Sequence, residues 1–287
     1  MNGHLRDVLA ADPGPDEVTD SVGYQRCGAV AVVTLARPEQ HNALDLAAWR
    51  RIGRLAGELR DDDGLRAVVI RGAGGRAFGA GADIAEFPRT RMTARAALHY
   101  NKSVAAALDA VAAVPVPVLA LIDGLAVGGA LELSAACDLR IASERSRFGI
   151  PIGRLGVTLG LTEARALARL IGGAELKYLL FSGRLVDTER ARRTGLIQSV
   201  VPSDRLVDEA LDLLAAITTG SLPTLRAAKA VTDMTTRPLT PADTEELARI
   251  AVEVYDGPDL AEGVAAFTEG RAPVFPSRRP TPTAEVR

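Results

Sequence analysis

The sequence predicts an α/β fold in which most strands pair in parallel. Short apolar runs rich in β-branched residues alternate with longer segments whose apolar residues recur every three or four positions. Two of the runs lead into loops of glycine and alanine, and the pattern after about residue 162 is mainly helical. Strands that alternate with helices in this way are typical of parallel sheets joined by helical connections.

Each expected element has a local signal. The first helix is expected to follow Asn42, a candidate N-cap, and to stop at the acidic run 61–63. Its apolar stripe consists of Leu44, Ala48, Ile52, Leu55 and Leu59. Strands are expected at 29–35, 67–70, 117–122, 139–142 and 197–201. Further helices are expected at 93–113, 128–137, 203–217, 221–235 and 240–255.

These elements divide the chain into four parts. Residues 1–22 are polar and contain proline, so we expect a flexible N-terminal extension. Residues 23–202 form the α/β core, and residues 203–275 form a C-terminal helical region. Residues 276–287 are rich in Pro, Ser, Thr and Arg, which predicts a disordered tail.

Composition narrows the class of protein. The 287 residues are 47% hydrophobic and 24% charged with a net charge of −2, which indicates a soluble globular protein and gives no sign of nucleic-acid binding. No run has the ~18 apolar residues of a membrane span, and the acidic N-terminal segment resembles no targeting peptide. We therefore expect a cytoplasmic protein without a membrane partner. Cys27 and Cys137 are expected to be buried thiols, and no spacing suggests a metal site.

Two segments of small residues are the strongest indication of a functional site in the sequence. Residues 78–84 read Phe-Gly-Ala-Gly-Ala-Asp-Ile, and residues 128–132 read Gly-Gly-Ala-Leu-Glu. Backbone N–H groups of Ala82 and Gly129 could converge on one oxygen atom, which is the construction of an oxyanion hole. The alternative is that the small residues only permit close packing of strand and helix.

An alternative hypothesis is a dinucleotide-binding site, because residues 72–77 match the pattern G-x-G-x-x-A of a dinucleotide-binding loop. A dinucleotide site requires the loop to open directly into a helix. A second cluster of small residues follows here instead, so a nucleotide-dependent oxidoreductase is the less favoured hypothesis.

Several motifs together resemble the crotonase superfamily, also called the enoyl-CoA hydratase/isomerase family. Residues 35–44 look like its R-P-x-x-x-N-A-L motif, and residues 66–70 with 77–87 look like its first oxyanion loop. Residues 123–142 look like the second loop. Later landmarks of the family are matched at 180–183, 191–201 and 259–273.

The resemblance implies a spiral core of repeated ββα turns and a helical region that forms a homotrimer or a dimer of trimers. It implies an acyl-CoA thioester as substrate, a role in lipid metabolism, no permanently bound cofactor and no metal. The residues that it places around the coenzyme A ester are Gln40, Ala43, Ala80, Ala82, Asp83, Ile84, Ala85, Gly128, Gly129 and Ile152.

The acids of the site depart from the family pattern. Family hydratases use two glutamates; Glu132 matches the first, but Ile152 stands in the place of the second. Isoleucine cannot transfer a proton, whereas hydration needs one group to accept a proton and one to deliver it. Glu163 is an additional acid, and it is either a helix-start glutamate or a partial replacement for the missing one. We expect Ala82, Gly129, Glu132 and Glu163 to be the catalytic groups.

These departures leave the reaction open. The family class predicts a hydratase or isomerase that stabilises a thioester enolate. A single acid at Glu132 would be sufficient for double-bond isomerisation or for decarboxylation. A chain that binds acyl-CoA without turnover is the alternative from another functional class.

Overall fold

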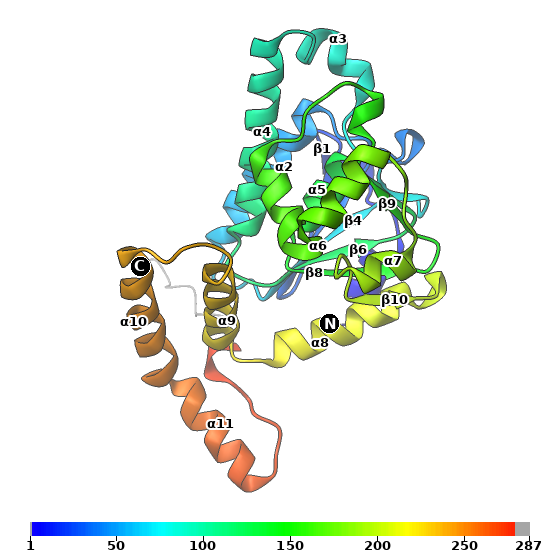
Figure 1. Cartoon of the computed structure of the whole chain (residues 1–287). Helices are drawn as coiled ribbons and strands as arrows, with labels where there is room; N and C mark the ends of the chain where they lie inside the picture. Colours follow the sequence, from blue (N-terminus) through cyan, green and yellow to red (C-terminus); the bar gives the residue numbers. More distant parts are fainter. Residues whose placement is uncertain (1, 279–287) are drawn as a thin grey trace, which may run out of the picture.

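The computed structural model describes residues 2–278, and Figure 1 shows a layered α/β body from which the last helices extend. The larger sheet has seven strands in the order β1-β2-β3-β4-β6-β8-β10. Their bounds are β1 Val18–Thr19, β2 Val22–Cys27, β3 Val30–Leu35, β4 Ala67–Gly72, β6 Val118–Ile122, β8 Leu139–Ser143 and β10 Ser199–Val201. From β3 to β10 every neighbouring pair is parallel, as the sequence predicts.

A second, all-parallel sheet has three strands in the order β5-β7-β9. These strands are β5 Ala77–Gly79, β7 Leu125–Val127 and β9 Arg147–Gly149. Each directly follows one strand of the larger sheet, and each is followed in turn by a helix. The unit of two strands and a helix is thus repeated three times, which confirms the fold class that the sequence predicts.

The helices between the strands are α2 Leu46–Arg60, α3 Phe87–Thr90, α4 Ala94–Ala112, α5 Gly129–Ala136, α6 Leu161–Ser182 and α7 Thr188–Arg193. The predicted stripe is buried in the main core, but Leu44 precedes α2 and forms a β-bridge with Ala82, so only its other four residues lie on the helix. Asp45, not Asn42, is the N-cap of α2, since its side chain accepts a 2.8 Å hydrogen bond from the Ala48 N–H. Asn42 instead has a left-handed backbone with φ of 56°.

The loop at residues 72–77 is a turn between two strands. Gly74 and Gly75 have positive φ angles of 75° and 60°, and the chain continues into β5 rather than into a helix. A dinucleotide loop must present its N–H groups at a helix start. The nucleotide-binding alternative is therefore wrong for this loop.

The N-terminal segment is not the flexible extension that its composition suggests. Residues Asn2–Ala10 form helix α1, which buries Leu5, Val8 and Leu9 in a second core cluster with α8 Leu206–Thr219. The buried Arg71 guanidinium donates from Nη1 to the carbonyls of Val8 and Ala11, at 2.6 and 2.7 Å. The apolar residues at 5, 8 and 9 have helical spacing, and the polar residues around them obscured it.

The C-terminal region consists of α8, α9 Leu222–Met234, α10 Pro241–Tyr255 and α11 Pro258–Glu269. Helices α9 to α11 extend away from the sheets in Figure 1. Residues 276–278 form a short 3-10 turn, and the Ser277 N–H donates to Asp259 Oδ1 at 3.1 Å, so this part of the expected tail is ordered. Residues 279–287 lie outside the described part of the chain.

Three further expectations concern particular side chains or segments. Cys27 and Cys137 are buried thiols, as predicted. Within residues 2–278, no helix combines the length and apolarity needed to cross a bilayer. The same residues contain no group of His, Cys, Asp and Glu side chains arranged to hold a metal ion.

The packing of α1 gives a first prediction. Leu9→Ala should lower the free energy of unfolding by about 2 to 5 kcal/mol, because it removes a buried side chain and leaves a cavity. Urea denaturation measures this loss. The matched control is Leu98→Ala, whose side chain is 69% exposed. Equal, small losses for both variants would mean that the N-terminal segment is a loose extension after all.

Candidate active site

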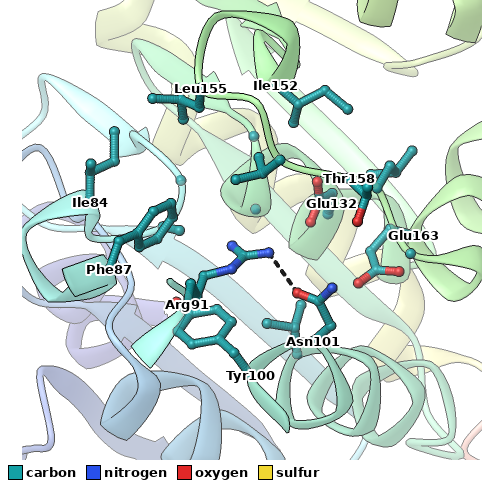
Figure 2. Close-up of a pocket in the computed structure, with 18 of the residues that line it drawn as sticks. Ile84, Phe87, Arg91, Tyr100, Asn101, Glu132, Ile152, Leu155, Thr158 and Glu163 are labelled. Atoms are coloured by element: carbon teal, nitrogen blue, oxygen red, sulfur yellow. Dashed lines mark hydrogen bonds between the residues drawn. The ribbon is translucent and has the colours of Figure 1, made fainter. Parts of the chain in front are cut away.

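A cavity of about 150 Å³ opens where the chain leaves the three strands of the smaller sheet. Residues 80–82 follow β5, residues 127–129 join β7 to α5, and residues 151–152 follow β9. Residues 157–163 lead into α6 and close another side, while α3, α4 and their connection supply larger side chains (Figure 2). Loops at the carboxyl ends of parallel strands are the usual position of ligand sites in α/β proteins.

The two small-residue segments meet closely at the back of this cavity. A Cβ atom on Gly81 would lie 3.3 Å from the Gly129 nitrogen, and one on Gly129 would lie 3.8 Å from the Ala82 nitrogen. Gly81 and Gly128 have φ angles of 93° and 53°, which side chains rarely permit. The backbone segments that contain the Ala82 and Gly129 nitrogens therefore lie close together.

The hydrogen bonds around Ala82 leave its N–H available. The Leu44 N–H donates to Gly81 O at 2.7 Å, and the Asp83 N–H donates to Leu44 O at 2.8 Å. This parallel bridge uses the groups on either side of Ala82, so the Ala82 N–H points away from Leu44. Among residues 2–278, neither the Ala82 nor the Gly129 N–H donates to a backbone carbonyl.

Glu132 lies on the first turn of α5, inside the cavity. Its side chain is buried, with 8% of the residue exposed. Burial in an apolar surrounding is the main reason that its pKa rises to about 8; the nearby Glu163 carboxylate raises the pKa further, and the Arg91 guanidinium opposes the rise. At neutral pH this carboxyl therefore holds its proton.

Glu163 faces the same cavity from α6, and only 4% of the residue is exposed. Burial raises the pKa of its carboxyl, while a hydrogen bond from its own backbone N–H opposes the rise. Its Oε2 atom is buried and has no hydrogen-bond partner among residues 2–278. A Cβ on Gly160 would lie 2.2 Å from that atom, so a glycine there gives the carboxylate its space. Glu163 is both a helix-start residue and a cavity residue.

Apolar side chains form another wall of the cavity. Ile152, Leu155 and Leu159 line it, with Ile152 half-buried where the family pattern has an acid. In Figure 2, Ile152 and Leu155 lie on the opposite side of the pocket from Arg91 and Tyr100. The cavity thus presents one aliphatic side and one polar side.

The remaining predicted ligand residues divide into two groups. Ala80 and Ile84 line the cavity together with Ala82, Gly128, Gly129 and Ile152. Gln40, Ala43, Asp83 and Ala85 are outside the lining. Asp83 forms an ion pair with Arg37 at 2.8 Å and accepts the Ala85 N–H at 3.0 Å. The hydrogen bond from Arg37 is the main reason that the Asp83 pKa is lowered.

Sequence reasoning missed the polar side chains of α4 and of the connection between α3 and α4. Arg91 packs over the rings of Phe87 and Tyr100, with its guanidinium carbon 4.9 and 4.6 Å from the ring centres. Its Nη2 atom donates to Asn101 Oδ1 at 2.6 Å (Figure 2). Arg91 and Asn101 stand in a polar stretch without a motif, so only their position in the fold brings them to the cavity.

Comparison with known proteins identifies the family. The sequence profile described as enoyl-CoA hydratase/isomerase matches residues 25–278. The chain belongs to the enoyl-CoA hydratase/isomerase family. This membership confirms the predicted resemblance and the expected class of acyl-CoA-processing enzyme.

Individual members of the enoyl-CoA hydratase/isomerase family match most of the chain. A probable enoyl-CoA hydratase of Mycobacterium bovis is 35% identical over 90% of this chain and 99% of its own length. A short-chain-enoyl-CoA hydratase of Clostridium acetobutylicum is 33% identical over 73% of this chain and 80% of its own. The crystal structure of an enoyl-CoA hydratase/carnithine racemase from Magnetospirillum magneticum aligns with a TM-score of 0.85 and 36% identity. That alignment covers 91% of this chain and 97% of the other.

The buried Glu132 makes the stability of this family member depend on pH. Its carboxyl keeps a proton up to about pH 8 in the folded state but ionises near 4.5 when exposed, so ionisation favours unfolding increasingly as pH rises between these values. Glutamine resembles the protonated carboxyl and does not ionise. Glu132→Gln should therefore raise the melting temperature little at pH 5 and clearly at pH 8, where the gain reaches a few kcal/mol at most (~1.4 kcal/mol per pKa unit).

Differential scanning calorimetry at both pH values measures this effect. Glu189→Gln is the matched control, because the Glu189 side chain is 85% exposed. A gain for Glu132→Gln that is the same at pH 5 and pH 8 would contradict the raised pKa.

Proposed function

We propose that this enzyme adds water to the double bond of a 2-enoyl-CoA, with Glu163 and Glu132 as its base and acid. The observation that carries the proposal is the position of Glu163, a second buried carboxyl in the same cavity as Glu132. Because Ile152 stands where the family pattern has an acid, Glu132 would be the single carboxyl for proton transfer if Glu163 were not in the cavity. Hydration needs two proton-transfer roles, and two carboxyls divide them most simply.

The thioester carbonyl is proposed to accept hydrogen bonds from the N–H groups of Ala82 and Gly129. Both groups face the cavity without a backbone partner in the described chain. Gly129 begins α5, where unpaired N–H groups and the helix dipole favour negative charge. Donors placed in this way stabilise the enolate oxygen, and loss of one such donor typically raises the barrier by ~3 kcal/mol.

The surroundings of Glu132 and Glu163 indicate which of the two carboxyls gives a proton and which accepts one. Because ionised Glu163 raises the pKa of Glu132, Glu132 is the carboxyl that keeps its proton. Glu163 takes a proton from water as the water oxygen bonds to Cβ of the enoyl group. The electron pair of the C=C bond shifts to the bond between Cα and the carbonyl carbon, and the π pair of the carbonyl moves to its oxygen, which gives the enolate. Glu132 then delivers its proton to Cα and the carbonyl re-forms, and proton exchange with solvent restores both carboxyls.

The second candidate is a one-acid reaction, and Ile152 favours it. With an aliphatic side chain at that position, Glu132 alone could move a proton between two carbons, or protonate the carbanion left by decarboxylation. Glu163 would then be a residue of the first turn of α6 without a role in the reaction. In either reaction the coenzyme A thioester enters as substrate, and the proton transfers use the chain's own groups. A chain that binds acyl-CoA without turnover is the remaining alternative.

The assembly is also a proposal. Helices α10 and α11 expose large apolar side chains, which a second copy of the chain would cover. They are Val252, Tyr255, Leu260, Val264 and Phe267. Together with the family resemblance, this supports a homotrimer or a dimer of trimers, and a cytoplasmic location remains the expectation from the sequence.

Removal of either carboxyl tests the reaction. If hydration uses both, Glu132→Gln and Glu163→Gln should each lower kcat for crotonyl-CoA hydration by about 10²- to 10⁴-fold. Mass spectrometry of a panel that also contains 3-enoyl-CoA and malonyl-CoA substrates detects the alternative reactions.

The pattern of loss decides between the candidates. Turnover lost only in Glu132→Gln would assign a one-acid mechanism and reject the hydratase proposal. Full activity in both variants would reject both roles, and binding without turnover of any thioester by the wild type would favour a binding protein. Glu189→Gln again serves as the surface control.

The pH dependence gives an independent test. Glu132 must be protonated to act as the acid, and its pKa is about 8. The kcat/KM for hydration should therefore fall as pH rises through about 8. Steady-state kinetics between pH 6 and 10 measure this, with thermal unfolding at each pH as the control. A rate that increases across this interval would contradict the assignment of Glu132 as the acid.

A further inference from the structure

Arg91 is a charged group in the cavity that the proposed reaction does not use. The residue lines the same cavity as Glu132 and Glu163 and is half-buried. Figure 2 shows its guanidinium among Phe87, Tyr100 and Asn101, on the side of the cavity opposite the aliphatic wall. Packing over two rings and the 2.6 Å hydrogen bond to Asn101 fix the orientation of the group.

Most of the hydrogen-bonding capacity of this guanidinium is unused. An arginine side chain has five N–H donors. Within the described residues, Arg91 forms no ion pair with a carboxylate, and its Nε atom is buried without a hydrogen-bond partner. Asn101 accepts through Oδ1, so its Nδ2 remains as a further donor beside the guanidinium. The pair presents several donors and one positive charge to the cavity.

We propose that Arg91 and Asn101 bind a carboxylate on the acyl group, so that the substrate class is a CoA thioester of a dicarboxylic acid. This inference rests on the proposed function, because it requires the acyl group to occupy this cavity. An arginine fork binds a carboxylate through two parallel hydrogen bonds, which gives orientation as well as affinity. A second carboxylate at the far end of the acyl chain would supply the partner that Arg91 lacks.

The charges around Arg91 allow an anion to enter. Glu132 holds its proton at neutral pH, so it does not repel a second carboxylate. Glu163 is ionised in the proposed reaction and Arg91 favours that charged form, so an entering carboxylate shares the guanidinium charge with Glu163. Glu86 interacts with Tyr100. A purely aliphatic acyl group would instead cover a cation without a partner, at a desolvation cost that disfavours it. The site should therefore prefer an acyl group with a terminal carboxylate for two reasons. The carboxylate is attracted to Arg91, and an aliphatic group would desolvate Arg91 without compensation.

Binding of two saturated thioesters of equal chain length tests the inference without turnover. Glutaryl-CoA ends in a carboxylate, pentanoyl-CoA ends in a methyl group, and free CoA lacks an acyl group. Isothermal titration with the full chain should show that the wild type prefers glutaryl-CoA over pentanoyl-CoA by about 10- to 100-fold, the value expected for a charge-assisted hydrogen-bonded pair. Arg91→Met should abolish the preference, and Arg91→Lys should keep part of it.

Arg89→Met is the matched control, since Arg89 is an exposed arginine on α3, two residues before Arg91, and does not line the cavity. It should keep the preference of the wild type. Equal binding of the two thioesters by the wild type overturns the inference even if Arg91→Met fails to fold. The inference is also overturned if Arg91→Met weakens the binding of free CoA as much as that of glutaryl-CoA, since Arg91 would then bind a phosphate of the coenzyme.

The result separates this inference from the proposed reaction. A preference for glutaryl-CoA without hydration of any enoyl-CoA would support the carboxylate site and reject the hydratase. Hydration of crotonyl-CoA with no preference between the saturated thioesters would support the hydratase and reject the carboxylate site. Failure of both thioesters to bind would reject both.

Discussion

The close approach of two backbone segments is the constraint on which the rest of the site depends. Residues 80–83 can lie against the start of α5 only because Gly79 and Gly81 lack side chains; a Cβ on Gly79 would lie 2.6 Å from the Ala130 Cβ, and one on Gly81 would lie 3.3 Å from the Gly129 nitrogen. Buried Asn42 fixes the neighbouring turn, since its Nδ2 donates to the carbonyls of Ala73 and Ala77. This contact brings two N–H groups together and also places Glu132, one turn into α5, beside them.

Burial raises the pKa of both cavity carboxyls, and it has a cost in stability. In water both would be ionised at neutral pH, and neither could act as an acid. Inside the cavity, desolvation keeps the proton on Glu132, and the charge of Glu163 adds to the effect. A buried ionisable pair with an unsatisfied oxygen destabilises the fold, so packing elsewhere must compensate for it. A side chain kept for stability alone would be apolar here.

Much of the fold could be predicted from the sequence, but the site could be predicted only in part. β-Branched runs such as 67–70 and the stripe of α2 depend on local periodicity, and they formed the expected strand and helix. Helix α1 escaped prediction because its three apolar residues, Leu5, Val8 and Leu9, are few among polar neighbours, although tertiary packing buries them. Motifs brought Ala82, Gly129 and Glu132 to one cavity. Arg91 and Asn101 have no motif; the connection between α3 and α4 carries Arg91 to the cavity, and α4 carries Asn101.

The position of the second acid has a consequence for the polarity of the cavity. With isoleucine at 152, the loop after β9 contributes Ile152 and Leu155 as an aliphatic wall, while the acid comes from α6. The charged groups come instead from Arg91, α5 and α6, while α4 and Thr158 add polar side chains. An acyl group held at its carbonyl by Ala82 and Gly129 would have one apolar side and one charged side along its length. Such a division favours a single orientation of a ligand with a charged end, because the reverse orientation would place a carboxylate against isoleucine and leave Arg91 without a partner.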